Sequence, residues 1–284
     1  MNHMDMRKGS GKNGRDGSMG IMKIEFTFHS KVLEFDTPVC ALIPFEEDRT
    51  DPAAKYQTLY LYHGGHGDCE DFLSYSAIQE LAMKHRLAVI MPSVNNSFCQ
   101  NLYRGKDFFL FMNEEIPSVC EKLFPLSTAG ENRFAGGISM GGYGAVRLAL
   151  TDPDRFSAAF SLGGALDFPM GMYESVNGLV WNPFRPETIC ENPLEMEGTD
   201  SDLKELARRL KETGRRIPGL FLRCGAQDIY CHHMNLSVLK SWKENDIPFL
   251  YEEGDFPHSW EYWRKCLPGA LDWLPLKNSY VKES

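Results

Sequence analysis

The fold is decided by one stretch of sequence, RFAGGISMGGYGAVRLAL, which spans residues 133–150. Its first part, 133–139, is an apolar run typical of a buried strand, and its second part, 140–150, has the small residues and spacing of a helix. The junction between them, Gly137 to Gly141, matches G-x-S-x-G. In that motif a serine occupies a sharp turn from strand to helix, and both glycines are needed because the turn leaves no room for side chains. The stretch therefore predicts a strand–turn–helix unit with Ser139 at the turn.

Short apolar runs and helical segments alternate on both sides of this unit. The sequence predicts strands at 58–64, 87–92, 133–139, 155–164, 219–225 and 248–254, and helices at 72–85, 107–124, 140–150, 201–214, 230–244 and from about 259. A kink is expected at Pro117, and the alternating residues from Met22 onward indicate an antiparallel lead-in. This order predicts an α/β fold, with a mostly parallel central sheet and helices on both faces. Ligands of such sheets bind outside the carboxyl ends of the strands.

Two segments lack this alternation. Residues 1–21 are rich in Gly, Lys and Arg and hold almost nothing apolar, so we expect a disordered tail before one domain that spans 22–284. Residues 165–200 are rich in Pro and Gly and show no periodicity. A connection this long is usually functional in a compact domain, and this one lies between two strands, so it predicts a lid inserted over the site.

The composition excludes several classes of protein. The chain has 284 residues, of which 43% are hydrophobic and 24% charged, as in ordinary soluble globular proteins. No apolar run approaches the roughly 18 residues of a membrane span. The net charge of −9 argues against nucleic acid and an anionic membrane surface as partners. Eight cysteines without CxxC or zinc-site spacing are typical of buried thiols in a reducing cytoplasm, so we expect a cytoplasmic protein without metal or cofactor. The sequence is also compatible with a homo-oligomer.

A serine nucleophile needs a base and an acid that orients it. His258 follows the last predicted strand, where the chain order Ser, Asp or Glu, His places the base. Asp228 directly follows the strand at 219–225 and is the candidate acid, although an aspartate there could instead cap the next helix. Asp255 is the rival acid, three residues before His258.

The negatively charged oxygen of an acyl-transfer intermediate needs backbone donors. One donor is expected from the N–H of Met140, the residue after the serine, and the other from the Gly-rich loop at 63–68, with Gly65 as the candidate. The same loop holds His63 and His66, which could instead suggest a pair of metal ligands. No third ligand follows at a fitting spacing.

Four segments, in their order and spacing, resemble the esterase D/tributyrin esterase family of α/β hydrolases: YHGGHGD (62–68), GISMGGYGA (137–145), CGAQDIY (224–230) and FPHSWEYW (256–263). The resemblance covers about residues 22–275. The family includes short-chain acyl esterases, feruloyl esterases, acetyl esterases of plant polysaccharide degradation and S-formylglutathione hydrolases.

The resemblance implies an α/β-hydrolase fold and a role for each candidate residue. Ser139 would be the nucleophile, His258 the base and Asp228 the orienting acid, while the oxyanion donors would be Gly65 and Met140.

We also expect four residues to line the substrate pocket. Gly64 and His66 lie in the Gly-rich loop, Trp181 in the lid and Trp260 beside the candidate base. Large apolar side chains in the lid gain little by pointing into water, so they should cover the core or the mouth of the site.

These features predict a serine carboxylesterase that acts on short-chain acyl esters, such as acetyl or feruloyl esters of carbohydrates. A thioesterase of the S-formylglutathione type is an alternative, but such enzymes usually carry His before the nucleophile and this chain has Ile138. A catalytically inactive hydrolase fold used for binding is a third hypothesis, against which the complete set of Ser139, Asp228 and His258 argues.

Overall fold

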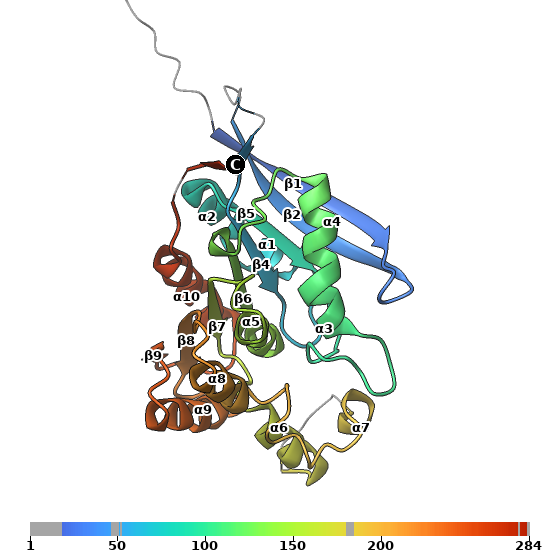
Figure 1. The fold of residues 1–284 in the computed structure, drawn as a ribbon, viewed down its shortest axis with the longest axis vertical. Helices are drawn as coiled ribbons and strands as arrows, with labels where there is room; N and C mark the ends of the chain where they lie inside the picture. The colour runs from blue at the N-terminus through green and yellow to red at the C-terminus, as the bar shows by residue number, and fades with distance from the viewer. Residues whose placement is uncertain (1–18, 47–50, 52, 180–184, 278, 283–284) are drawn as a thin grey trace, which may run out of the picture.

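An eight-stranded sheet forms the centre of the molecule, in the order β1-β2-β5-β4-β6-β7-β8-β9 (Figure 1). The computed structural model describes residues 19–46, 51, 53–179, 185–277 and 279–282. The lead-in strands β1 (Met19–His29) and β2 (Asp36–Glu46) are antiparallel, and β2 also pairs antiparallel with β5 (Ala88–Pro92). The remaining strands run parallel: β4 (Thr58–Tyr62), β6 (Arg133–Ile138), β7 (Ala158–Leu162), β8 (Gly219–Gly225) and β9 (Leu250–Gly254). The predicted α/β fold is therefore confirmed.

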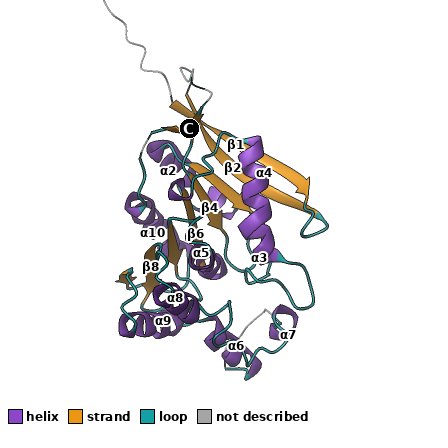
Figure 2. Cartoon of the chain, viewed as in Figure 1, coloured by secondary structure: helices purple, strands orange, loops and turns teal. Residues whose placement is uncertain are grey.

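Helices cover both faces of this sheet, and each face has its own apolar core (Figure 2). On one face lie α1 (Asp71–Tyr75), α2 (Ile78–His85) and α10 (Trp260–Trp273). On the other lie α3 (Phe108–Leu110), α4 (Ile116–Leu123), α5 (Ser139–Thr151), α6 (Phe168–Val176), α8 (Leu203–Glu212) and α9 (His232–Glu244). Strands β4 to β7 are buried along their whole length, which explains why their sequences are continuous apolar runs.

Small elements complete the described chain. A 3₁₀ turn (Gly130–Asn132) precedes β6, α7 (Pro186–Ile189) lies beside α6 at the end of the molecule opposite the C-terminus, and β10 (Val281–Lys282) pairs with β3 (Ala54–Lys55) (Figure 1). None of the helices among the described residues is both long and apolar enough to cross a membrane.

The expected boundary of the tail at residue 21 is wrong. Strand β1 already begins at Met19, and its first residues pair with the end of β2, from Met19 opposite Glu46 to Ile21 opposite Pro44. The backbone of β2 extends far enough to pair with these residues, whatever their side chains. Residues 1–18 lie outside the described residues.

The single helix predicted at 72–85 is also wrong, because it is divided into α1 and α2. Ser76 adopts an extended conformation between them. Its hydroxyl donates a hydrogen bond to the carbonyl of Phe72 at 2.6 Å and accepts one from the N–H of Ile78 at 3.3 Å. A serine that bonds to nearby backbone in this way competes with helix continuation.

The irregularity expected at Pro117 lies just before that residue. A π-helical segment, Phe111–Glu115, links α3 to α4, and Pro117 occupies the first turn of α4. Proline has no N–H to donate to the preceding turn, so a wider turn there leaves fewer bonds unsatisfied than a regular helix would.

Candidate active site

Ser139 stands at a strained turn between β6 and α5. Its φ angle is +50°, a left-handed conformation that is costly for any residue with a side chain. A Cβ atom placed on Gly137 would lie 2.4 Å from the backbone carbon of Gly141, and one placed on Gly141 would lie 2.2 Å from the carbonyl oxygen of Tyr62. Both glycines of the motif are therefore required by close backbone packing.

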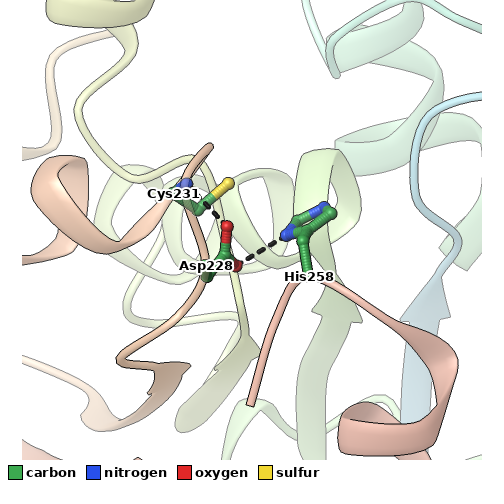
Figure 3. Close-up of side chains that lie close together, drawn as sticks. All are labelled: Asp228, Cys231 and His258. Atoms are coloured by element: carbon green, nitrogen blue, oxygen red, sulfur yellow. Dashed lines mark hydrogen bonds and ion pairs between the residues drawn. The ribbon is translucent and has the colours of Figure 1, made fainter. Parts of the chain in front are cut away.

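The turn brings Ser139 to the two other candidate catalytic residues. Asp228 follows β8, and His258 lies between β9 and α10. The Oγ of Ser139 is 2.9 Å from Nε2 of His258. Nδ1 of His258 is 2.6 Å from Oδ2 of Asp228, and this second contact is drawn in Figure 3. The three side chains thus form one hydrogen-bonded chain, from the serine hydroxyl through the imidazole to a carboxylate.

Asp228 is held by the backbone around it. Its Oδ1 accepts hydrogen bonds from the N–H groups of Tyr230 at 3.0 Å and Cys231 at 2.9 Å, and only 2% of the residue is exposed. The capping role considered for Asp228 is wrong, because α9 begins at His232 with Cys231 as its N-cap, and Asp228 instead binds N–H groups of the turn before the helix. These bonds use Oδ1, whereas Oδ2 faces His258. The rival Asp255 is exposed and accepts a hydrogen bond from Gln227 at 2.7 Å.

Cys231 lies beside this pair, and Figure 3 shows its sulfur close to the Asp228 carboxylate and the His258 ring. One ligand atom from each of the three residues lies within 4.8 Å of the others, and Zn²⁺ accepts all three donor types. However, two ligands bound at about 2.0–2.1 Å around a tetrahedral ion lie about 3.3 Å apart, whereas Asp228 and His258 are 2.6 Å apart. Burial and the Asp228 charge also raise the pKa of the Cys231 thiol well above its ordinary value. The arrangement fits a hydrogen-bonded pair with a neutral thiol beside it better than a metal centre.

His63 has a structural role that the sequence did not indicate. It is 1% exposed, its Nδ1 donates to the carbonyl of Gly64 at 2.7 Å, and its Nε2 accepts the N–H of Val94 at 2.9 Å. Burial lowers the pKa of His63, which favours the neutral ring that these two bonds require. His63 therefore braces the Gly-rich loop. Within the described chain, neither His63 nor His66 belongs to a cluster of three possible metal ligands.

The Gly-rich loop approaches the serine closely. A Cβ on Gly64 would lie 3.3 Å from Cβ of Ser139, and both Gly64 and Gly65 line the cavity at the site. Met140 follows the serine as the second residue of α5. The roles of Gly65 and Met140 as oxyanion donors stay predictions.

A cavity of about 300 Å³ opens above Ser139 and His258. Three of the four residues predicted to bind substrate, Gly64, His66 and Trp260, line it, and Trp181 lies outside the described residues. Phe168 and Met172, from the segment predicted to be a lid, line the cavity as well. Several other residues line the cavity although the sequence analysis did not predict them there. They include Asp71, Phe98, Ala165, Asp167, Gly171, Tyr230, Cys231, Met234 and Trp263.

Phe98 was missed because it comes from a segment far from any motif, and its ring lies 5.4 Å from that of Phe168 in the 165–179 segment. Tyr230 and Trp263 lie inside the motifs at 224–230 and 256–263, and Met234 lies just beyond the first of these, so the sequence offered a signal for all three. Asp71 had a usable signal, because it is in the chain only a few residues beyond the Gly-rich loop.

Comparisons with known proteins agree with this geometry. Residues 30–209 match the family model described as putative esterase. An acetyl esterase of Caldicellulosiruptor saccharolyticus is 30% identical over 275 residues, which are 90% of this chain and 98% of the relative. Among solved structures, the Staphylococcus aureus fluorophosphonate-binding serine hydrolase F is 29% identical, with a TM-score of 0.81 over 90% of this chain and 98% of the other. An S-formylglutathione hydrolase, also from Staphylococcus aureus, is 28% identical, with a TM-score of 0.80 over 89% and 98% of the two chains.

Proposed function

The chain belongs to the putative esterase family and is a carboxylester hydrolase, and on this premise we propose that Ser139, His258 and Asp228 hydrolyse small acyl esters through an acyl-enzyme. The observation that carries the proposal is the continuous hydrogen-bonded chain, with distances of 2.9 Å and 2.6 Å between its members.

The geometry supports a two-step reaction. Nε2 of His258 takes the hydroxyl proton as Oγ of Ser139 attacks the ester carbonyl carbon, and the N–H groups of Gly65 and Met140 stabilise the negative oxygen. The imidazolium, held by Asp228, then gives its proton to the departing alcohol. A water molecule, deprotonated by the same ring, attacks the acyl-enzyme, and the acid and free Ser139 are released.

The cavity favours a small acyl group. A volume of about 300 Å³ is at the lower end of ligand pockets, and its walls are mostly apolar. The relative named acetyl esterase supports an acetyl group over the larger feruloyl group. Acetyl esters of carbohydrates are therefore the first substrates to test.

Hydrolysis of S-formylglutathione is the second candidate, because one of the similar structures is an S-formylglutathione hydrolase. Against it, the residue before the serine is Ile138, a buried apolar residue that lines the cavity, where such hydrolases usually carry histidine.

The proposal is tested by covalent labelling combined with a substrate panel. A fluorophosphonate should add its phosphonyl mass to Ser139, and the label should be absent from the Ser139→Ala protein. p-Nitrophenyl esters of increasing acyl length, acetylated sugars, feruloylated sugars and S-formylglutathione then rank the candidate substrates. A folded native protein that neither reacts with the phosphonate nor cleaves any ester would be the inactive binding fold instead.

A further inference from the structure

The charges around the cavity are strongly one-sided. The residues that line it include two aspartates, Asp71 and Asp167, and two histidines, His66 and His258. No lysine or arginine lines it among the residues that the structure describes. Whether the carboxylates act on a substrate depends on how each of them is compensated.

Asp167 is fully compensated. Its side chain is completely buried, Oδ2 lies 3.0 Å from Nζ of Lys204 and accepts the hydroxyl of Ser237 at 2.5 Å, and Oδ1 caps α6 by accepting the N–H of Met170. Its charge is paired with a lysine and its oxygens are occupied, so Asp167 fixes the base of the lid.

Asp71 has no such cation. Its carboxylate accepts the backbone N–H of Asp68, and in the described part of the chain no basic side chain forms an ion pair with it. Desolvation and the neighbouring Asp68 charge raise the pKa of Asp71, and the same two effects would act on any other negatively charged group placed beside it. A negatively charged group that enters the cavity would meet this carboxylate.

The lining of the cavity comes from both faces of the sheet, and the aspartate without a paired lysine or arginine lies at only one of its two ends. Phe168, Met172 and Met234 belong to the core on the α5 side of the sheet. Asp71 begins α1 on the opposite side, where Trp260 packs against its neighbour Phe72 with ring centroids 5.3 Å apart. The apolar end suits the hydrocarbon of an acyl group, and the end with the carboxylate suits hydroxyl groups of an alcohol.

We propose that Asp71 determines specificity for the alcohol part of the ester, admitting neutral hydroxyl-bearing or cationic groups and rejecting anionic ones. The inference rests on the esterase function proposed above. A sugar hydroxyl can donate a hydrogen bond to the carboxylate, whereas glutathione brings two carboxylates and one ammonium group into the site. Asp71 thus favours carbohydrate esters over S-formylglutathione.

The test uses three aryl acetates that carry a neutral, a carboxylate or a trimethylammonium group at the same ring position. Their intrinsic reactivities differ, but these cancel when the Asp71→Asn variant is compared with the native protein on each substrate. Relative to the neutral ester, we expect the variant to raise kcat/KM for the anionic ester and lower it for the cationic ester, each by about five- to tenfold at low salt. Added salt should shrink both changes.

Glu70→Gln is the matched control, because it removes the same charge from the adjacent residue, which is exposed and does not line the cavity. Glu70→Gln should change the kcat/KM of the anionic and of the cationic ester, each relative to the neutral ester, by less than twofold. The amide introduced by Asp71→Asn keeps an oxygen that can accept the Asp68 N–H, so the loop contact survives in this variant.

The outcomes separate this inference from the proposed function. Equal loss on all three esters would make Asp71 a residue that only positions the loop, and unchanged ratios with normal hydrolysis of the neutral ester would also overturn the inference while leaving the esterase intact. If the folded native protein cleaves none of the esters, the proposed function fails and the inference falls with it.

Discussion

The turn around Ser139 and the lid segment at 165–179 both line the cavity, but they are held by different kinds of contact. At the turn, backbone packs against backbone, and a single added carbon on Gly141 would lie 2.2 Å from the carbonyl oxygen of Tyr62. The position of Ser139 is therefore fixed by covalent geometry and by the central sheet, with little dependence on individual side chains.

The lid is held by side chains. Glu174 of α6 pairs with Nε2 of His233 at 2.9 Å and 3.0 Å, and the Asp167–Lys204 pair holds its base. Its outer surface includes the strongly exposed Leu179. Contacts of this kind can change without altering the fold, so we expect the turn to determine the chemistry and the segment at 165–179 to determine the choice of substrate.

The largest effect is expected at the turn itself. Ser139→Ala should lower kcat by about 10⁶-fold, because removal of a triad nucleophile leaves only binding and the oxyanion donors. Hydrolysis of p-nitrophenyl acetate measures it, with circular dichroism as the check on folding and Ser74→Ala, at an exposed serine, as the control. Retention of most activity in a folded variant would refute the catalytic assignment.

The next effect concerns the acid. Asp228→Asn should reduce kcat by about 10⁴-fold, because an amide next to Nδ1 favours the wrong tautomer of His258. Asp255→Asn should have little effect, since Asp255 is exposed and bonds to Gln227. If Asp255→Asn were the more damaging change in kcat, the two residues would exchange roles.

Substitution of one glycine in the turn and one in the lid should change the free energy of unfolding by different amounts. Gly141→Ala should destabilise the protein by about 3 kcal/mol or more, because its Cβ meets two backbone carbonyl oxygens in the central sheet region. Gly178→Ala in the lid has open space around its Cβ, and only its φ of +65° opposes it, so about 1 kcal/mol is expected. Urea denaturation of both variants measures the difference. Equal losses would mean that the turn is less constrained than its geometry indicates.

The same difference explains what could be predicted from the sequence. The turn at Ser139 was predictable because its constraints lie within five residues, and the order of strands and helices placed Asp228 and His258 at the same sheet edge. The break at Ser76 was missed because a serine hydroxyl bonding to local backbone leaves the hydrophobic period unchanged.

The cavity walls were less predictable, because they depend on contacts between distant segments. Among the described residues, no lysine or arginine lines the cavity beside Asp71, whereas Asp167 is compensated by Lys204 and Ser237, which are 37 and 70 residues away. From the sequence, His63 could be interpreted as a metal ligand, because the hydrogen bond that it accepts from the N–H of Val94 is visible only in the structure.

The smallest effect tests whether the lid selects the acyl group. Met172 of α6 is fully buried and lines the cavity, so Met172→Ala should enlarge the apolar end of the site. We expect the ratio of kcat/KM for hexanoate over acetate esters to rise by about tenfold, since one apolar contact in a substrate pocket is worth roughly 1–3 kcal/mol. Val176→Ala, on the same helix but 46% exposed and away from the cavity, is the control and should leave the ratio unchanged. Truncation of a buried methionine also lowers stability, by about 2–5 kcal/mol, so thermal unfolding is measured on the same samples. A lower melting temperature with an unchanged acyl profile would make Met172 a core residue only, and the selection of substrate by the lid would lose its support.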